Sequence, residues 1–308
     1  MDFELNEELK MFQRAVRDFC EKEIKPHAQH ADETGELPWN AIHKMPELGM
    51  TGLQVPEEYG GIDIDTTGAS IAVEELGRVC GSTALTISAH NGLGAGPIVK
   101  WGSDAQKAHW LPILTAGDVL GSLALTEPQA GSDLLNGAQT NAVRDGDEWV
   151  INGTKAWITN ASYAPVIVVL VRTDADAGSR GFSMILVETD RDGVTVHPKE
   201  KKMGLKASPT HMITFENVRV PYDNLLGEEG RGFYYTMQTL DSGRISIGAL
   251  SVGIAQGAFE EMVKYAQDRQ AFGEPIANKQ AIQMKISDAA MEIEAARTLV
   301  YKAAWMKD

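Results

Sequence analysis

The spacing of apolar residues changes twice along this chain, and these two changes limit the possible folds more than any other feature. Up to about Gly117, apolar residues recur every three or four positions, as they do in amphipathic helices. Between residues 119 and 220, alternating and β-branched runs are separated by turn signals such as Asp145-Gly146. Helical spacing returns after Arg231. The sequence therefore predicts an α+β multidomain protein, with a helical domain at 1–118, a central β-barrel or sandwich at 119–228, and a helical bundle at 229–308.

The elements of the N-terminal part follow from the same spacing and from capping residues. Pro26 is expected to follow the end of the first helix, and Gly49 is expected to cap the second. The glycine-rich segment 91–96 should interrupt the helices where backbone approaches another element closely. His90 beside it is either a ligand contact or a structural histidine. The expected helices cover residues 3–24, 39–48, 68–78, 82–90 and 104–114.

The central and C-terminal parts also carry specific signals. The stretch 243–258 is unusually rich in glycine, and each glycine inside a helix costs up to about 1 kcal/mol relative to alanine. A neighbouring helix or a ligand should therefore lie almost against its backbone. Apolar residues from Ile282 to Ala303 alternate by four and three, which indicates the seam of a bundle that is incomplete at Asp308. Strands are expected at 119–126, 138–143, 147–151, 165–172, 181–188, 194–198 and 211–220.

Composition excludes several classes of protein. The chain has 308 residues, with 43 acidic against 28 basic side chains and a net charge of −15, so a nucleic-acid surface is not expected. Two cysteines, Cys20 and Cys80, are too few for a disulfide framework or a zinc site, and we expect no metal. No run of 18 apolar residues is present, so no membrane span is expected. The acidic N-terminus, with Asp2 and Glu4, predicts a cytoplasmic protein, or a mitochondrial matrix protein whose leader was removed.

Two segments of the central part could carry chemistry. The first, LALTEPQAGS from Leu123 to Ser132, is a strand that Glu127-Pro128 breaks before a tight loop with free backbone donors. The second is Trp157-Ile158-Thr159, a flat aromatic ring with a hydroxyl beside it. An ordinary hairpin turn and a buried core tryptophan are the alternatives.

These two motifs together resemble the acyl-CoA dehydrogenase family, over nearly the whole chain and with short-chain, butyryl-type members as the nearest match. The resemblance implies FAD-dependent α,β-dehydrogenation of a short-to-medium acyl-CoA to the trans-2-enoyl-CoA, as in β-oxidation of fatty acids. It implies an electron-transfer flavoprotein as the acceptor and a homodimer or homotetramer. It also implies that the missing part of the bundle comprises about two helices.

The resemblance assigns site residues by their match to the family motifs. FAD would contact Leu123, Leu125, Thr126, Gly131, Ser132, Trp157, Ile158 and Thr159, the leucines and Gly131 through their backbone. The substrate would contact Ser132, Asp241 and Arg244, although Asp241 and Arg244 could instead be a surface ion pair. A neighbouring subunit's FAD would contact Arg269, Phe272 and Gln280. A basic cluster of Lys199, Lys201, Lys202 and Lys206 lies either near the CoA phosphates or on a solvated loop.

The catalytic base is the part of the site that these residues do not supply. Dehydrogenation needs a base for the α-proton, and no side chain can accept the hydride, so a cofactor must. The chain has no GxGxxG after a strand, which argues against a Rossmann site. The family's minority position for the base is Gly243 here, so no catalytic residue is expected within the chain, and the base is expected beyond Asp308. A noncatalytic flavin or acyl-CoA-binding module and a relative with other flavin chemistry remain the alternatives.

Overall fold

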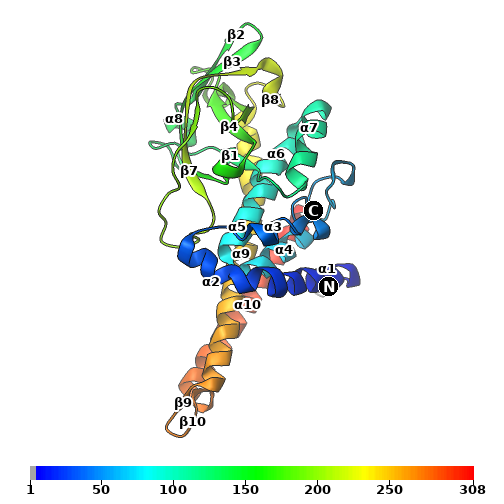
Figure 1. Cartoon of the computed structure of the whole chain (residues 1–308), viewed down its shortest axis with the longest axis vertical. Helices are drawn as coiled ribbons and strands as arrows, with labels where there is room; N and C mark the ends of the chain where they lie inside the picture. The colour runs from blue at the N-terminus through cyan, green and yellow to red at the C-terminus, as the bar shows by residue number, and fades with distance from the viewer. Residues whose placement is uncertain (1–4) are drawn as a thin grey trace.

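The computed structural model describes residues 5–308, which form a helical N-terminal region, a β-sheet region and a pair of long C-terminal helices (Figure 1). This is the expected order of fold elements. Residue Phe3, where the first helix was expected to begin, lies outside the described residues. The helices of the first region are α1 (Glu7–Phe19), α2 (Lys25–Thr34), α3 (Trp39–Ile42), α4 (Thr66–Val79), α5 (Gly81–Ala89), α6 (Gly96–Trp101) and α7 (Asp104–Thr115).

Three expected helix boundaries are wrong: the helix expected at 39–48 ends at Ile42 and is followed by a 3₁₀ turn at Met45–Leu48, and a π-helical turn explains each of the other two. Pro26 does not follow a helix end, because the π-helical residues Cys20–Ile24 join α1 directly to α2. Pro26 falls in the first turn of α2, where the amide hydrogen that it lacks would have little use. The glycine-rich segment likewise stays helical, as a π-helical turn at His90–Ala95 between α5 and α6. The expected close approach is confirmed, since a Cβ on Gly94 would lie 2.3 Å from the Cα of Gly121.

One eight-stranded sheet forms the central region, with strand order β6-β7-β3-β2-β4-β5-β8 and β1 parallel to β4. Both faces of β4 are buried: Val168 and Leu170 pack toward residues of α6, α7 and α9, and Val169 packs into the sheet's own core. This explains its uninterrupted apolar sequence. The strands are β1 (Ser122–Ala124), β2 (Asn141–Asp145), β3 (Glu148–Thr159), β4 (Val166–Arg172), β5 (Phe182–Glu188), β6 (Val194–Val196), β7 (Thr210–Pro221) and β8 (Leu225–Leu226).

Strand β3 departs from the sequence prediction because it is much longer than expected. The pair Asn152-Gly153 reads as a turn, but β3 runs through it to Thr159. Gly153 has φ +150° and sits at a shift in the β3–β7 register, so it forms a bulge in place of a turn. A Cβ there would lie 2.4 Å from Thr140 Oγ1. The segment after Pro221, where no strand was expected, contains a short strand, β8, which pairs with β5.

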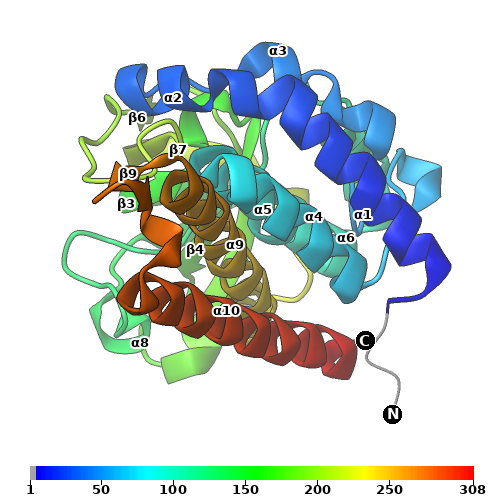
Figure 2. The ribbon, with the colours of Figure 1, turned by 90° about the horizontal axis from the view of Figure 1, so that it is seen from below.

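The two C-terminal helices are α9 (Gly232–Asp268) and α10 (Gln280–Lys307), joined by a small hairpin of β9 (Gln270–Ala271) and β10 (Glu274–Pro275). Figure 2 shows α4 between α1 on one side and α9 with α10 on the other. The small residues of α9 have the expected purpose: Cβ atoms on Gly253 and Gly257 would lie 2.2 and 2.1 Å from carbonyl oxygens of α4. None of the helices in residues 5–308 is long and apolar enough to cross a membrane.

Candidate functional site

The two motif segments lie side by side, because the chain leaving β1 runs along the end of β3. Three hydrogen bonds join them. Ser122 Oγ donates to Thr159 O at 2.7 Å, and Ala156 N donates to Thr126 O at 2.8 Å. Lys155 Nζ donates to Leu125 O at 3.0 Å. The fold therefore brings together two segments that are about 30 residues apart in the sequence.

Trp157 is not a core residue. Its side chain is 59% exposed, whereas the next residue, Ile158, is buried. Trp157 has φ +62° and lies at a shift in the β3–β7 register between Lys155 and Ile158. No other aromatic ring of residues 5–308 stacks on it. A non-glycine residue with positive φ stores strain that surrounding structure must offset, and such residues concentrate at functional sites. The bulge therefore leaves a flat apolar face of Trp157 open at the surface.

The loop after β1 is a tight turn with an accessible tip. Glu127 N donates to Ala130 O at 2.9 Å, and Ala130 N donates back to Glu127 O at 3.0 Å. Gly131 and Ser132 beyond the turn are exposed, and a Cβ on Gly131 would have no atom within 4 Å. The ordinary hairpin turn that was the alternative interpretation is thus present. It leaves open space in front of the backbone of Gly131.

These residues fit an isoalloxazine ring, which is flat and carries polar atoms along one edge. The exposed indole of Trp157 supplies a stacking face, and the half-buried Thr126 and Thr159 supply hydroxyls beside it. Leu123, Leu125 and Ile158 have buried side chains and could contact such a ring only through their backbone.

A buried ion pair underlies the two segments, and the sequence analysis missed it. Lys155 Nζ lies 2.8 Å from Glu127 Oε1, and both side chains are almost completely buried. Burial lowers the pKa of Lys155, while the neighbouring carboxylate opposes the shift. For Glu127, burial raises the pKa, but Lys155 and the surrounding hydrogen bonds outweigh it and hold the pKa below its ordinary value. Local sequence offered no signal of it, because Glu127 and Lys155 are 28 positions apart and each stands beside polar residues.

His90 is structural. Its ring is fully buried, Nε2 donates to Thr51 O at 2.8 Å, and Nδ1 accepts from Gly121 N at 2.7 Å. Nδ1 therefore ties the π-helical turn to the residue before β1, and Nε2 ties it to the loop that contains Thr51. Burial lowers the pKa of His90 to about 4, although the bond to Thr51 opposes the shift. The histidine is neutral, and no ring atom remains for a ligand.

Asp241 and Arg244 lie one turn apart on α9, and both side chains are exposed. No ion pair joins them, so the alternative of a surface ion pair is wrong. Between them, a Cβ on Gly243 would meet only Leu93 Cδ2, at 3.7 Å. Glu260, further along α9, is already bonded to Arg78 and Gln256.

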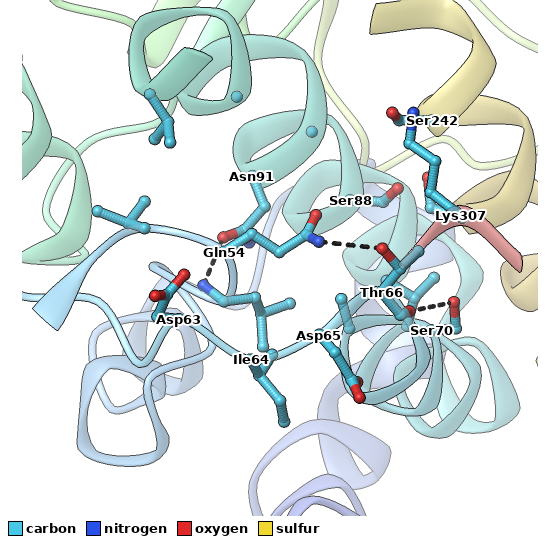
Figure 3. Close-up of a pocket in the computed structure, with 18 of the residues that line it drawn as sticks. Gln54, Asp63, Ile64, Asp65, Thr66, Ser70, Ser88, Asn91, Ser242 and Lys307 are labelled. Carbon is cyan, nitrogen blue, oxygen red and sulfur yellow. Dashed lines mark hydrogen bonds between the residues drawn. The ribbon is translucent and has the colours of Figure 1, made fainter. Parts of the chain in front are cut away.

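A cavity of about 410 Å³ adjoins this turn of α9. Figure 3 shows its walls, which come from the loop that precedes α4, from α4, from the helical segment 88–100, from α9 and from the C-terminal end of α10 at Lys307. Ser242 and Ser246 of α9 line it on either side of Gly243. Apolar side chains such as Val73 and Val99 share the walls with serine and threonine hydroxyls. The cavity can therefore take a flexible, mainly apolar group.

The remaining predicted residues lie away from this site. Arg269, Phe272 and Gln280 gather near the hairpin at the far end of α9 and α10 from the sheet, where Phe272 is 97% exposed (Figure 1).

The lysine cluster at 199–206 is mostly engaged within the chain. Lys199 donates to the carbonyl of Gly35, Lys202 to Ser208 and Thr210, and Lys206 pairs with Asp32. These bonds favour a loop that is docked on α2 over a site for phosphates.

Comparison with known proteins identifies the fold and its relatives. Three family models match: acyl-CoA dehydrogenase N-terminal domain at residues 6–118, middle domain at 122–218 and C-terminal domain at 230–308. A probable acyl-CoA dehydrogenase of Bacillus subtilis is 50% identical, over 100% of this chain and 81% of its own. Butyryl-CoA dehydrogenase of Megasphaera elsdenii is 40% identical with a TM-score of 0.95, over 100% of this chain and 81% of that one. An acyl-CoA dehydrogenase of Bacillus anthracis, solved with FAD, is 38% identical with a TM-score of 0.90, over 98% of this chain and 51% of that one.

Proposed function

Because the chain belongs to the acyl-CoA dehydrogenase family, we propose that it is an FAD-dependent oxidoreductase that forms the α,β double bond of a short-chain acyl-CoA. The observation that carries the proposal is Trp157, an exposed and strained indole with Thr126 and Thr159 beside it. One structurally similar dehydrogenase was solved with FAD, and another is a butyryl-CoA dehydrogenase. FAD, when bound, would accept the hydride that leaves the β-carbon.

The substrate would lie between the flavin loop and α9. Ser132 at the loop tip and the exposed Asp241 and Arg244 of α9 are our candidates for contacts with the acyl-CoA. Arginine suits this role because its planar fork pairs with two phosphate or carbonyl oxygens at once. The acyl chain would enter the 410 Å³ cavity beside Ser242 and Ser246. Apolar side chains of its walls, such as Val73 and Val99, would contact the carbon chain, and the thioester would remain outside.

Assembly with other proteins is part of the same proposal. Arg269, Phe272 and Gln280 belong to the hairpin region around β9 and β10, which lies at the opposite end of the molecule from the sheet that contains Trp157 (Figure 1), so they would serve the FAD of a second subunit in a homodimer or homotetramer. An electron-transfer flavoprotein would reoxidise the reduced flavin. Light scattering of the flavin-loaded protein tests the proposed homo-oligomer, and a flavin-loaded monomer would contradict it.

Two measurements test the function. Titration of the purified chain with FAD should give a bound, yellow protein, because flavin binding does not depend on a catalytic base. Addition of butyryl-CoA under anaerobic conditions should then perturb the flavin spectrum more than decanoyl-CoA does. A chain that takes up no FAD would refute the proposal, and a loaded chain that no acyl-CoA perturbs would favour a noncatalytic flavin-binding module.

A further inference from the structure

Glu127 collects four hydrogen-bond donors in the core of the β-sheet region. Its Oε1 accepts from Lys155 Nζ at 2.8 Å and from Thr140 N at 3.0 Å. Its Oε2 accepts from Gln139 N and from Gln129 Nε2, both at 2.7 Å. Glu127 itself is 3% exposed and Lys155 is 0% exposed. The carboxylate is therefore enclosed by donors that come from three separate segments of the chain.

We propose that Glu127 and Lys155 are positioning residues for the flavin site, because their ion pair locks the loop after β1 against the bulge that presents Trp157. The inference rests on the proposed FAD binding. Neither side chain reaches the exposed surface, so both act through the residues that they hold.

Lys155 makes the connection to the bulge. It is the last residue of β3 in regular register before Trp157, and its Nζ reaches back to Leu125 O and to Glu127. Ala156, between Lys155 and Trp157, is bonded through its N to Thr126 O. A positive φ at tryptophan persists only where neighbouring contacts over-determine the backbone. These two anchors stand directly before the strained residue, where that constraint is needed.

The carboxylate of Glu127 has no neutral substitute at this place. Every one of its four partners is a donor, so an acidic group with two acceptor oxygens satisfies them all. A glutamine would keep one acceptor oxygen and turn an NH₂ group toward either Lys155 and Thr140 or Gln129 and Gln139. The two donors on that side would lose their acceptor, and the loop would move away from β3.

The test compares Glu127→Gln with a matched control, Glu75→Gln. Glu75 is 1% exposed and accepts from Arg17 and Arg78, so the control makes the same chemical change at an equally buried carboxylate of the helical region. Thermal unfolding of the flavin-free proteins measures the general loss of stability. Titration with FAD, monitored by the visible absorption band of the flavin, measures the FAD affinity and the environment of the bound flavin.

We expect both variants to lose stability, but only Glu127→Gln to weaken FAD binding, by tenfold or more, and to shift the visible band of bound flavin. Glu127→Asp, which keeps the charge and both oxygens, should recover part of the affinity. Should neither variant fold, Gln129→Ala removes one donor at an exposed position and should weaken FAD binding several-fold.

Equal FAD affinities in the wild type, Glu127→Gln and Gln129→Ala would overturn the inference while leaving FAD binding intact. A similar loss of FAD affinity in Glu75→Gln would also overturn it, because the effect would then be one of general stability. A wild-type chain that binds no FAD would refute the proposed function instead.

Discussion

Replacing Trp157 by alanine tests the proposed stacking face, and the structure sets the size of the effect. The side chain is 59% exposed, which is roughly 150 Å² of an indole side chain of up to about 250 Å². A ring stacked on one face covers about half of that area. At about 25 cal/mol per Å², roughly 75 Å² is worth ~2 kcal/mol, or about 30-fold in the dissociation constant of FAD.

The assay is a titration of the flavin-free protein with FAD, followed by quenching of flavin fluorescence. Two further variants separate stacking from backbone strain. Asparagine tolerates a positive φ far better than alanine does, so Trp157→Asn should lose the same FAD affinity with a smaller loss of stability. Trp305→Ala removes an exposed tryptophan of α10 and should leave FAD binding unchanged. FAD affinities within twofold of wild type in both Trp157 variants would refute the stacking role.

Three further predictions concern the groups around this site. Burial lowers the pKa of His90 from 6.5 to about 4, so folding favours the neutral imidazole. The stability that neutral His90 contributes to the folded protein is fully present above pH 6.5 and is lost as the pH falls toward 4. The loss approaches about 3 kcal/mol of unfolding free energy, and urea denaturation should show it in the wild type but not in His90→Gln; parallel pH profiles would contradict it. Gly257→Ala would place a Cβ 2.1 Å from a carbonyl oxygen of α4, so it should lower the free energy of unfolding by about 1–3 kcal/mol or more. Gly92→Ala, whose Cβ would meet no atom within 4 Å, should lower it far less. Gly243→Glu would place a carboxylate beside Arg244, in space bounded only by Leu93, and should raise the rate at which butyryl-CoA reduces the flavin of the 308-residue chain. No increase over the unmodified chain would count against a base at this position.

Much of the fold could be predicted from local sequence. The helix–sheet–helix order follows from apolar spacing, since each type of element needs its own period to bury one face. The seven expected strands are all present, and the glycines of α9 correctly indicated close packing, here against α4. The two motif segments were identifiable because a polar loop and an isolated tryptophan are unusual neighbours for buried strands.

The errors occur where a neighbouring element overrides local preference. Glycine and proline normally end helices, but a π-helical turn at Cys20–Ile24, with Cys20 and Ile24 buried, leads directly into α2, and another carries the chain through the glycines of His90–Ala95, where Gly94 packs against Gly121. Asn152-Gly153 resembles a turn, yet pairing with β7 extends β3 through it.

The tertiary structure alone decided how the site is built. Exposure of Trp157 depends on a register shift against β7, which has no signature within three residues of sequence. The meeting of Glu127 with Lys155 is also invisible locally, because charged residues in a strand usually face solvent. Only the folded sheet turns both charges inward, where each compensates the burial of the other. Local sequence could thus indicate the two segments, whereas long-range pairing fixed that Trp157 is exposed and that Glu127 and Lys155 are buried.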